Sequence, residues 1–526
     1  MLSPVWAKLY HCHEANAVMS QSLGVNLKSQ SRTADTFLVG VFAMLLINFL
    51  QRIVGLARNL GFSLFLPEDQ LGLWSLANSF FIIAPPFIVL GLPGSFGKFV
   101  EHYRQRGQLK PYVVRVSKVC LVGLLGLTML MLTMPAQISV SLYGQVQPYS
   151  IIVWTVVTLT ILTVHNILYD IVLSMRLIRL VSLMQFINST SFCVLGVAGI
   201  YYYETWSILL PCYAMSCTLA MLPGLYGVAM ARQDFEGSQA LQSSDMWRRI
   251  LPFAAAMWLT NLLTNAFELS DRYMLLHIGD LGAEVGQAMV GQYYCGRILP
   301  NLLLSLAMMF SGIMLPYLSA EWERQQFSKI TRSMNNTLVM LCIVFTGISL
   351  AALAVAPILY HWVLGSRFNP AFEILPIGMM QAIWSGLAMI AANYLLCAEK
   401  GRQNAILLAV CLLLNIALNW PLIHWLGLSG AAIATTSANA VLYLLICWRL
   451  HREGCPIGRK TFIISFLPLS LILGVYATCL LFLVLAMVCG RTNWLLSDED
   501  RQSINQAVLP RLQRAGLPIH SLWLPT

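Results

Sequence analysis

The chain has 526 residues, of which 58% are hydrophobic and only 10% are charged, and its mean hydropathy is +0.71. Soluble domains usually carry about 25% charged residues, so this composition excludes an ordinary soluble protein and indicates a polytopic membrane protein. The net charge of +10 would suggest a nucleic-acid partner in a soluble chain. In a membrane protein lysine and arginine collect on cytoplasmic loops, so no nucleic acid is needed to explain it.

Apolar segments long enough to cross a bilayer recur along the chain. Runs of roughly 20 apolar residues predict thirteen membrane-spanning helices, because the hydrocarbon core is about 30 Å thick. The predicted spans are residues 36–57, 72–93, 113–134, 149–173, 181–203, 206–229, 250–272, 290–316, 336–357, 373–396, 403–425, 429–448 and 462–489. Alternate loops hold most of the 32 basic residues. These loops and the N-terminus are therefore predicted to be cytoplasmic, in a multi-pass protein of the inner membrane.

Two halves of six spans each follow from the polar interruption at residues 232–249. Because six is even, both halves enter the membrane from the cytoplasm, which predicts a parallel repeat about an axis along the membrane normal. The second span of each half also begins alike, near Leu71 and near Val290. The predicted domains are an N-terminal segment at 1–35, a six-helix lobe at 36–230, a linker at 231–249, a six-helix lobe at 250–450, an extra transmembrane helix at 461–489 and a polar tail at 490–526.

The two ends of the chain leave questions open. Residues 1–34 contain no apolar segment of the kind found in signal peptides, and Met19 is a second candidate start besides Met1. An odd number of spans places the C-terminal tail outside the cell. Its four arginines favour the inside instead, so its side stays undecided.

A polar stripe runs along the first predicted span. Asn48, Arg52, Gly55 and Asn59 follow the spacing i, i+4, i+7, i+11 and share one helical face, with Arg58 beside it. An isolated guanidinium at bilayer depth costs at least ~2.5–3.5 kcal/mol, so Arg52 should face protein or water rather than lipid. We expect Arg52 to line a water-filled cavity. Arg58 lies nearer the outer end and could instead reach the lipid headgroups.

The same stripe returns in the seventh predicted span. Asn261, Asn265, Glu268 and Arg272 occupy the same four offsets, and Asp271 takes the place of Arg58. Repetition of the stripe in both halves predicts two symmetry-related walls of one cavity. An alternative is an internal ion pair among Glu268, Asp271 and Arg272 that only fixes helix packing.

The eighth predicted span contributes Arg297 and Asn301, with Pro300 expected to bend the helix between them. A hydrogen-bonding seam between helices would explain the asparagine, but a buried arginine is harder to explain in that way. Counted from the loops, the arginines of all three spans lie in the outer half of the membrane, so a shared basic chamber for anionic cargo is predicted. Its proposed residues are Arg52, Arg58, Arg272, Arg297, Asn48, Asn261, Asn265 and Asn301.

Three acidic residues could bind a coupling cation, Na⁺ or H⁺, and they are Glu268, Asp271 and Asp170. For Asp170 a structural ion pair with Arg176 or Arg179 is the alternative. We find no motif for a metal site, a cofactor or a catalytic residue, and no loop is long enough for an extramembrane catalytic domain. An enzyme is therefore the less favoured class of function.

The segment from Leu412, LLLNIALNWPLIHWLGLSGAAIATTSANAVLYLL, resembles the multidrug/oligosaccharidyl-lipid/polysaccharide exporter superfamily. Its members carry an asparagine-rich eleventh span, a short glycine-containing turn and a small-residue helix start. The matching residues here are Asn415, Asn419, Gly427, Gly430, Ala431, Ala432, Ala434 and Thr435. Residues 49–103 are similar to the first two spans of polysaccharide exporters and, more distantly, of lipid II flippases. The resemblance covers essentially residues 36–450.

This resemblance implies an all-α, V-shaped transporter of two six-helix lobes that surround a central cavity. It implies alternating access of a polyprenyl-pyrophosphate-linked oligosaccharide from the inner to the outer leaflet, for surface polysaccharide biosynthesis. In lipid II flippases the arginines of the first span line the cavity, and Arg52 and Arg58 occupy the matching positions. A polysaccharide polymerase and glycosyltransferases are the expected protein partners.

Two other functions stay open at this point. A cation-coupled multidrug exporter of the same superfamily would need an acidic cavity, which the arginines oppose and which Glu268 and Asp271 favour. A non-transporting scaffold in polysaccharide assembly is the third class. The sequence leaves the sugar, the coupling ion and the oligomeric state undetermined.

Overall fold

The computed structural model describes residue 47 and residues 50–232, 241–278 and 282–491. Every regular element within these residues is helical, and ten helices are long and apolar enough to cross a membrane. The predicted all-α polytopic membrane protein is thereby confirmed. The predicted N-terminal segment at 1–35, the stripe residue Asn48 and the tail beyond residue 491 lie outside the described residues.

The first half contains a helix described over residues 50–65, followed by α3 to α9. Their bounds are α3 Glu68–Val89, η1 Pro93–Ser95, α4 Phe96–Gln105, α5 Leu109–Thr133, α6 Pro135–Tyr143, α7 Tyr149–Ser174, α8 Ile178–Tyr203, η2 Trp206–Ile208 and α9 Leu209–Met230. Pro67 separates the first helix from α3, since a proline fixes φ and suits the start of a helix. The helices α7, α8 and α9 pack against one another and form the outer layer of this lobe.

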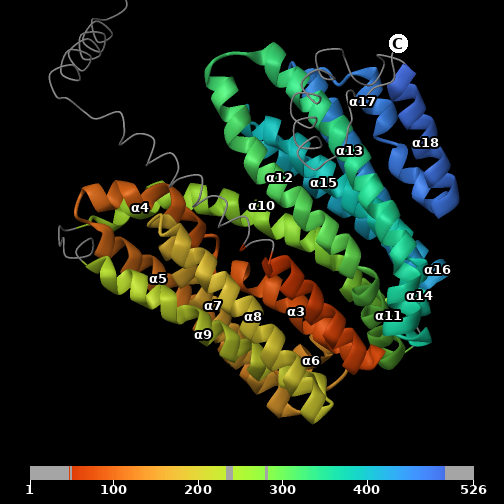
Figure 1. Cartoon of the computed structure of the whole chain (residues 1–526). Coiled ribbons are helices and arrows are strands. Elements are labelled where there is room, and N and C mark those ends of the chain that lie inside the picture. The colour runs from red at the N-terminus through yellow and green to blue at the C-terminus, as the bar shows by residue number, and fades with distance from the viewer. Residues whose placement is uncertain (1–46, 48–49, 233–240, 279–281, 492–526) are drawn as a thin grey trace, which may run out of the picture.

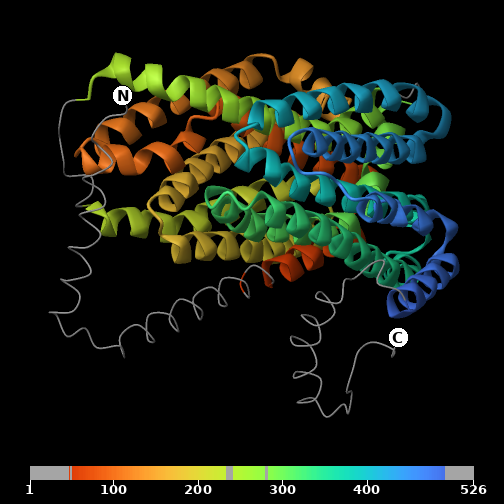
Figure 2. The ribbon, with the colours of Figure 1, turned by 90° about the horizontal axis from the view of Figure 1, so that it is seen from above.

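The second half runs from α10 to α18. Its bounds are α10 Ser243–His277, α11 Ala283–Gly296, α12 Ile298–Glu323, α13 Phe327–Pro357, η4 Ile358–Val363, η5 Ser366–Phe368, α14 Asn369–Glu373, α15 Leu375–Cys397, α16 Gly401–Arg452, α17 Arg459–Ile464, η6 Leu467–Leu473 and α18 Val475–Arg491. The helix α15 lies at the centre of this lobe, packed against α12, α13 and α16. In the view of Figure 2, from above, helices of the second half overlie part of the first half.

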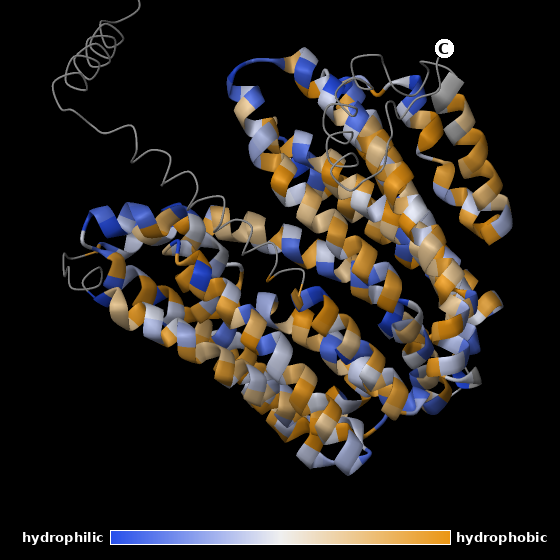
Figure 3. Ribbon diagram, viewed as in Figure 1, coloured by the Kyte–Doolittle hydropathy of each residue, from blue (hydrophilic) through white to orange (hydrophobic). Residues whose placement is uncertain are grey.

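The two lobes meet at one end and diverge toward the other. In Figure 1 they diverge from the lower right, where α6, α11 and α14 lie. We name this the junction end. The opposite end, which we name the basic end, carries the turns after α4, α12, α15 and α16, where lysine and arginine gather. Hydrophilic residues concentrate at the helix ends, whereas the long helices are mainly hydrophobic along their length (Figure 3). The predicted two-lobed, V-shaped architecture is confirmed.

The closest approach of the two lobes at the junction end joins α3 to α11 through two glycines. A Cβ on Gly72 would overlap the carbonyl oxygen of Gln287, and a Cβ on Gly291 would overlap the carbonyl oxygen of Glu68. Only glycine allows two helix backbones to approach so closely. The two glycines stand at matching positions of the repeat predicted from sequence, one residue after Leu71 and one after Val290.

Hydrogen bonds across the junction end hold this contact in place. Gln287 Nε2 donates to the carbonyl oxygen of Tyr143 at 2.7 Å, which joins α11 to the end of α6. Arg367 Nη2 donates to the carbonyl oxygens of Leu64 at 2.6 Å and Ser63 at 3.0 Å, which joins the second lobe to the end of the first helix. These bonds involve backbone carbonyls in the last turn of their helices, which have no partner within the helix.

The helix α10 belongs to both lobes. At the basic end Met246, Ile250 and Ala254 pack into an apolar cluster with α4 and α5 of the first lobe. Further along, α10 packs against α16 of the second lobe. Figure 1 shows the helix crossing from the α4 side to the α16 side. The residues predicted as a cavity wall on the seventh span therefore sit on the element that connects the lobes.

Three predicted spans are divided or joined differently in the observed helices. The eighth span, expected as one helix over 290–316, is divided at Arg297 into α11 and α12. Pro300 cannot donate to the carbonyl four residues earlier, at Gly296, so the bend expected at this proline becomes a break. The eleventh and twelfth spans form α16, whose two legs are separated by Gly427 with φ of 56° and ψ of −124°.

The last predicted span, 462–489, is not one continuous helix. Pro468 lies in the first turn of the short element η6, and Gly474 with φ of 92° follows its end before α18 begins. Because η6 and α18 pack against each other, the chain reverses direction at this glycine (Figure 1). The segment therefore ends near the basic end at which α17 begins.

Candidate functional site

A pocket of about 380 Å³ lies between the two lobes, and we name it the arginine pocket. Arg52 and Arg58 reach it from the first helix, Gln185 and Ser189 from α8, and Asn301 from α12. Both arginines are half-buried, as expected for guanidinium groups that face water inside a membrane. Among the described residues no carboxylate lines this pocket. Two positive charges therefore stand among neutral amide and hydroxyl groups.

The guanidinium of Arg58 is held by neighbours within its lobe. It lies over the ring of Phe192 at 5.1 Å from the ring centre, and its Nε and Nη2 both donate to Asn59 Oδ1 at 3.3 Å. A cation over an aromatic face is stabilised by the ring quadrupole. Tyr294 of α11 donates its hydroxyl to the same Asn59 oxygen at 3.0 Å. Arg58 thus faces the pocket between the lobes rather than the lipid headgroups.

Arg272 and Arg297, also predicted as cavity residues, lie behind the arginine pocket and are buried, with 7% and 6% of their surface exposed. Arg272 Nη1 donates to Ser79 Oγ of α3 at 2.5 Å. Arg297 Nη1 donates to Gln381 of α15 and lies 3.5 Å from the hydroxyl of Tyr293. The Nε of each arginine is buried without a hydrogen-bond partner among the described residues.

A carboxylate of α10 is the centre of a second polar group. Asp271 has no exposed surface, and its oxygens accept hydrogen bonds from Tyr293 at 2.7 Å, Thr435 at 2.6 Å and Asn419 at 2.9 Å. Asn415 accepts from Asn419 at 2.9 Å and donates to Thr435 at 3.1 Å. We name these five residues the Asp271 cluster. The glycine turn at the middle of α16 brings its asparagine leg and its threonine leg to the same carboxylate.

The hydrogen-bond donors to Asp271 among the described residues are all neutral, and Arg272 lies near the carboxylate without a direct ion pair. Within the described residues Glu268, Asp271 and Arg272 form no ion pair at 4.0 Å or less. The internal ion pair considered from the sequence is thus absent from this conformation. Asn419 Oδ1 is buried and has no hydrogen-bond donor among the residues that the structure describes, so an oxygen beside the carboxylate is available to a further ligand. Glu268 is partly buried and lies near the charges of Arg297 and Arg272.

Asn261 and Asp170 line a third, separate pocket of about 300 Å³ between α3, α7 and α10, which we name the Asp170 pocket. Asn265 donates to Asn261 Oδ1 at 2.7 Å along α10. Asp170 makes no ion pair with Arg176 or Arg179 in the described part of the chain. The structure therefore places the proposed cavity residues in neighbouring compartments: Arg52, Arg58 and Asn301 in the arginine pocket, Arg272 and Arg297 buried behind it, and Asn261 in the Asp170 pocket.

Residues of α16 and α15 complete the site although the sequence predicted no role for them in it. Asn415, Asn419 and Thr435 were identified only as marks of resemblance, and Gln381 was not singled out. The available signal was an asparagine repeated at i, i+4 within an otherwise apolar span. Such a pair costs free energy in hydrocarbon unless it is hydrogen-bonded, so it indicates a partner on a facing helix.

Chemically, the two groups suit opposite charges. The arginine pocket offers guanidinium forks that are always charged and that pair with phosphate through two parallel hydrogen bonds. The Asp271 cluster offers carboxylate, amide and hydroxyl oxygens, which suit a hard monovalent cation or a proton. Tyr294 links them, because its hydroxyl bonds Asn59 beside Arg58 while its neighbour Tyr293 bonds Asp271.

Solved structures with this fold include several membrane transporters. An inward-facing multidrug resistance MATE family transporter of the MOP superfamily is 15% identical and matches 78% of this chain and 98% of its own, with a TM-score of 0.62. Lipid II flippase MurJ in an inward closed conformation is 14% identical and matches 86% of this chain and 99% of its own, with a TM-score of 0.65. The D35N mutant of the Vibrio cholerae MATE transporter VcmN is 13% identical and matches 81% of this chain and 100% of its own, with a TM-score of 0.53. At these identities the likeness shows the fold alone.

The sequence itself places the chain in a family. Comparison with curated protein sequences gives no match. The sequence profile described as "Polysaccharide biosynthesis protein" matches residues 37–322, which is more than half of the 526 residues. Together with the fold, this match confirms the superfamily predicted from residues 36–450. The chain is a member of the polysaccharide biosynthesis protein family, with the two-lobed fold of the MATE transporters and MurJ.

Proposed function

We propose that the protein carries an oligosaccharide linked to a polyprenyl carrier through pyrophosphate from the inner to the outer leaflet of the cytoplasmic membrane. The single observation that supports this most strongly is the arginine pocket. It places Arg52 and Arg58 between the lobes with amide and hydroxyl groups and with no carboxylate from the described residues. A pocket of this composition favours an anion over a cation. Membership of the polysaccharide biosynthesis protein family favours a saccharide-bearing anion.

The physical problem that the protein would solve is desolvation. A sugar head with two phosphates loses its hydration in hydrocarbon at a large cost in free energy, so a polar cavity must replace the water. The prenyl chain is apolar, so it needs no polar cavity and can remain in lipid beside the lobes. We infer that the basic end faces the cytoplasm, since lysine and arginine gather there. In the conformation described, the lobes join at the opposite end, which suits loading from the inner leaflet and release after a rocking motion.

Coupling to a cation would make the movement directional, and we propose Asp271 as its site. A buried carboxylate with neutral partners is costly unless a proton or a cation neutralises it. The free oxygen of Asn419 beside it suits Na⁺ as an additional ligand. Since Asp271 lies on α10, which packs against both lobes, its neutralisation would act on the element that joins them.

The test uses purified protein in liposomes that contain a fluorescent, short-chain polyprenyl-pyrophosphate saccharide. Leaflet exchange is measured by chemical quenching from one side. We expect Arg52→Ala to slow the exchange about 10- to 100-fold, since charge-assisted hydrogen bonds contribute about 1.5–3 kcal/mol. Arg52→Lys should retain the charge but lose the bidentate fork, and should slow the exchange less. Arg179→Ala, an exposed arginine of the same lobe, is the matched control.

A multidrug exporter is the second candidate, favoured by the Asp170 pocket with its carboxylate beside Trp258 and Tyr169. Aromatic rings and an acid are the usual surroundings of an organic cation. Efflux of a cationic dye that survives Arg52→Ala and stops with Asp170→Asn would support this alternative and overturn the first proposal. Liposomes that show neither activity would favour a scaffold that acts with a polymerase or glycosyltransferases.

A further inference from the structure

A cavity of about 580 Å³ lies at the basic end of the first lobe, and we name it the basic-end pocket. It shares no lining residue with the arginine pocket. One wall is the end of α4 and the turn after it, with His102, Tyr103 and Arg106. The other wall is the start of α10, with Arg248 and Arg249. Helices from the two halves of the chain therefore build one pocket with arginine on both sides.

The charges of this pocket are not balanced within the described residues. Three arginines line it together with a single carboxylate, Asp245, and none of the three forms an ion pair at 4.0 Å or less in the described part of the chain. Arg249 Nη1 instead donates to His102 Nε2 at 3.0 Å. Burial, and after it the charges of Arg106 and Arg249, lower the pKa of His102 below its ordinary value, so this histidine stays neutral near pH 7.

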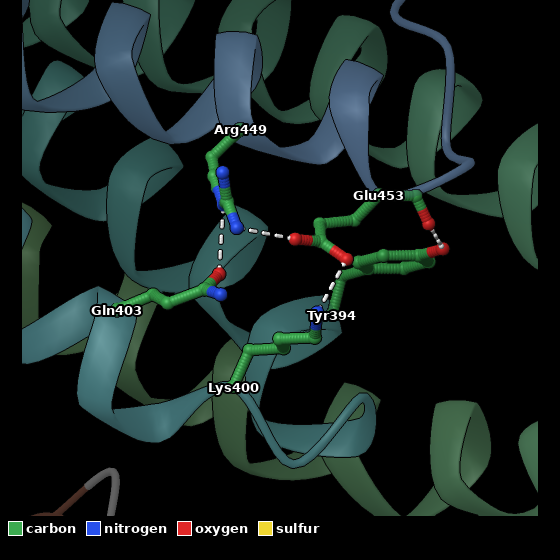
Figure 4. A network of polar contacts seen from close by, with 5 residues as sticks. All are labelled: Tyr394, Lys400, Gln403, Arg449 and Glu453. Atoms are coloured by element: carbon green, nitrogen blue, oxygen red, sulfur yellow. Dashed lines mark hydrogen bonds and ion pairs between the residues drawn. The ribbon is translucent and has the colours of Figure 1, made fainter.

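At the basic end of the second lobe, by comparison, several basic side chains form ion pairs with carboxylates. There Glu453 pairs with Lys400 at 2.8 Å and with Arg449 at 2.6 Å, and Arg449 also donates to Gln403 (Figure 4). The turn after α12 repeats the pattern, since Lys329 pairs with Glu321 at 2.7 Å. Carboxylates therefore accompany the packed basic side chains of that lobe. In the basic-end pocket, by contrast, no carboxylate of the described residues forms an ion pair with Arg106, Arg248 or Arg249.

The position of the pocket indicates where its ligand comes from. The helix α10 has 35 residues, about 52 Å at 1.5 Å per residue, so its first turns extend beyond a hydrocarbon core about 30 Å thick. These turns carry Arg248 and Arg249, and we infer that they lie at the depth of lipid headgroups. Gln242 precedes the helix without capping it through its side chain, so the positive end of the helix dipole also faces the pocket.

We propose that the basic-end pocket binds the phosphate of an anionic phospholipid headgroup and that the bound phosphate joins α10 to the turn after α4. The apolar cluster of Phe99, Ile250 and Ala254 already packs these helices together beneath the pocket. The arginines on the two walls repel each other when the pocket holds only water. A phosphate between them replaces this repulsion with charge-assisted hydrogen bonds to both walls. This proposal does not depend on the identity of the transported substrate.

The test compares lipid binding by the full-length protein in uncharged detergent, measured by native mass spectrometry with dioctanoyl phosphatidylglycerol and dioctanoyl phosphatidylcholine. We expect the apparent Kd for phosphatidylglycerol to rise at least fivefold in Arg248→Gln/Arg249→Gln. The matched control is Arg176→Gln/Arg179→Gln, which removes two exposed arginines from the same end of the same lobe. Neither double variant should alter the weak binding of phosphatidylcholine.

The second readout is amide hydrogen exchange at residues 243–250. Phosphatidylglycerol should slow this exchange at least threefold in the wild type and in the control, but not in Arg248→Gln/Arg249→Gln. Arg106→Gln removes one exposed arginine from the opposite wall of the pocket. In this variant phosphatidylglycerol should still slow the exchange, but less than in the wild type. Inorganic phosphate that competes with the lipid at micromolar concentration would assign the pocket to a soluble phosphate compound. Equal phosphatidylglycerol affinity in the wild type, Arg106→Gln and Arg248→Gln/Arg249→Gln would overturn the proposal.

Discussion

The arginine pocket and the Asp271 cluster occupy matching places in the two halves of the chain, yet they differ in charge and in exposure. The first helix carries Arg52 and Arg58, half-buried beside a pocket between the lobes. The corresponding face of α10 carries Glu268 and Asp271, and the latter is sealed from solvent by three hydrogen-bond donors. One repeated stripe has thus given an open cationic site in one lobe and an enclosed acidic site in the other. This difference supports the proposal that the arginine pocket binds the cargo and the Asp271 cluster binds the coupling cation.

Reversing the charge of the open site should give the largest effect. Arg52→Glu would place a carboxylate in a pocket that is proposed to hold a pyrophosphate, and repulsion replaces the paired hydrogen bonds. We expect leaflet exchange of the lipid-linked saccharide to fall more than 1,000-fold, with the melting temperature changed by only a few degrees because the residue is half-buried. Measurable exchange at one tenth of the wild-type rate would contradict the proposed role of the pocket.

Neutralising the enclosed site should have a smaller effect of a different kind. Asp271→Asn keeps the size and the acceptor oxygen but removes the charge, so the hydrogen bonds from Tyr293 and Thr435 can persist. We expect exchange driven by a Na⁺ or H⁺ gradient to fall about 10- to 100-fold, to the rate without a gradient. Asn404→Ala, near the start of α16, is the control. A variant that still responds to both gradients would place coupling elsewhere, at Glu268 or Asp170.

The comparison also depends on the closed junction end, which keeps the arginine pocket accessible from one side only. Arg367→Ala removes the bonds to the carbonyls of Leu64 and Ser63. Since Arg367 is exposed, solvent weakens this contribution to about 1 kcal/mol, which corresponds to about a fivefold shift toward an open junction. Hydrogen exchange at residues 62–66 and 287–292 measures the shift. Exchange rates equal to those of the wild type would show that the glycine contact suffices to keep the junction closed.

The smallest expected effect concerns the separation of the pockets. In a cysteine-free background, Asn301→Cys and Asn261→Cys should both react with a small aqueous thiol reagent, because both positions are exposed. Saturating lipid-linked saccharide should slow the reaction at position 301 about threefold and leave position 261 unchanged within twofold. Equal protection at both positions would restore the single shared chamber predicted from the sequence.

The fold could be predicted well because hydrophobic length and basic asymmetry depend on the bilayer alone. What escaped prediction were the places where one residue overrides the pattern. Pro300, which was expected only to bend the eighth span, divides it, and Gly474 reverses the last one, although both segments are apolar over most of their length. Hydropathy reports how long a segment is, but not whether its backbone can continue as a helix.

For the candidate site, helical spacing predicted which polar residues share one face of a helix. It did not predict which pocket each of these residues lines. Asn261 and Glu268 share one face of α10, yet Asn261 lines the Asp170 pocket while Glu268 lies near Arg297. The reason is that α10 leaves the first lobe and joins the second between these residues. Such a change of neighbour depends on tertiary packing, which the spacing of one helix does not contain.

The contact between Gly72 and Gly291 is reciprocal in a way usually seen only between identical subunits. Each glycine meets the carbonyl of the residue four places before the other, Gln287 in one direction and Glu68 in the other. In a C₂ homodimer such an interface is isologous, with one surface patch used twice. The chain can therefore be regarded as a dimer fused into one polypeptide.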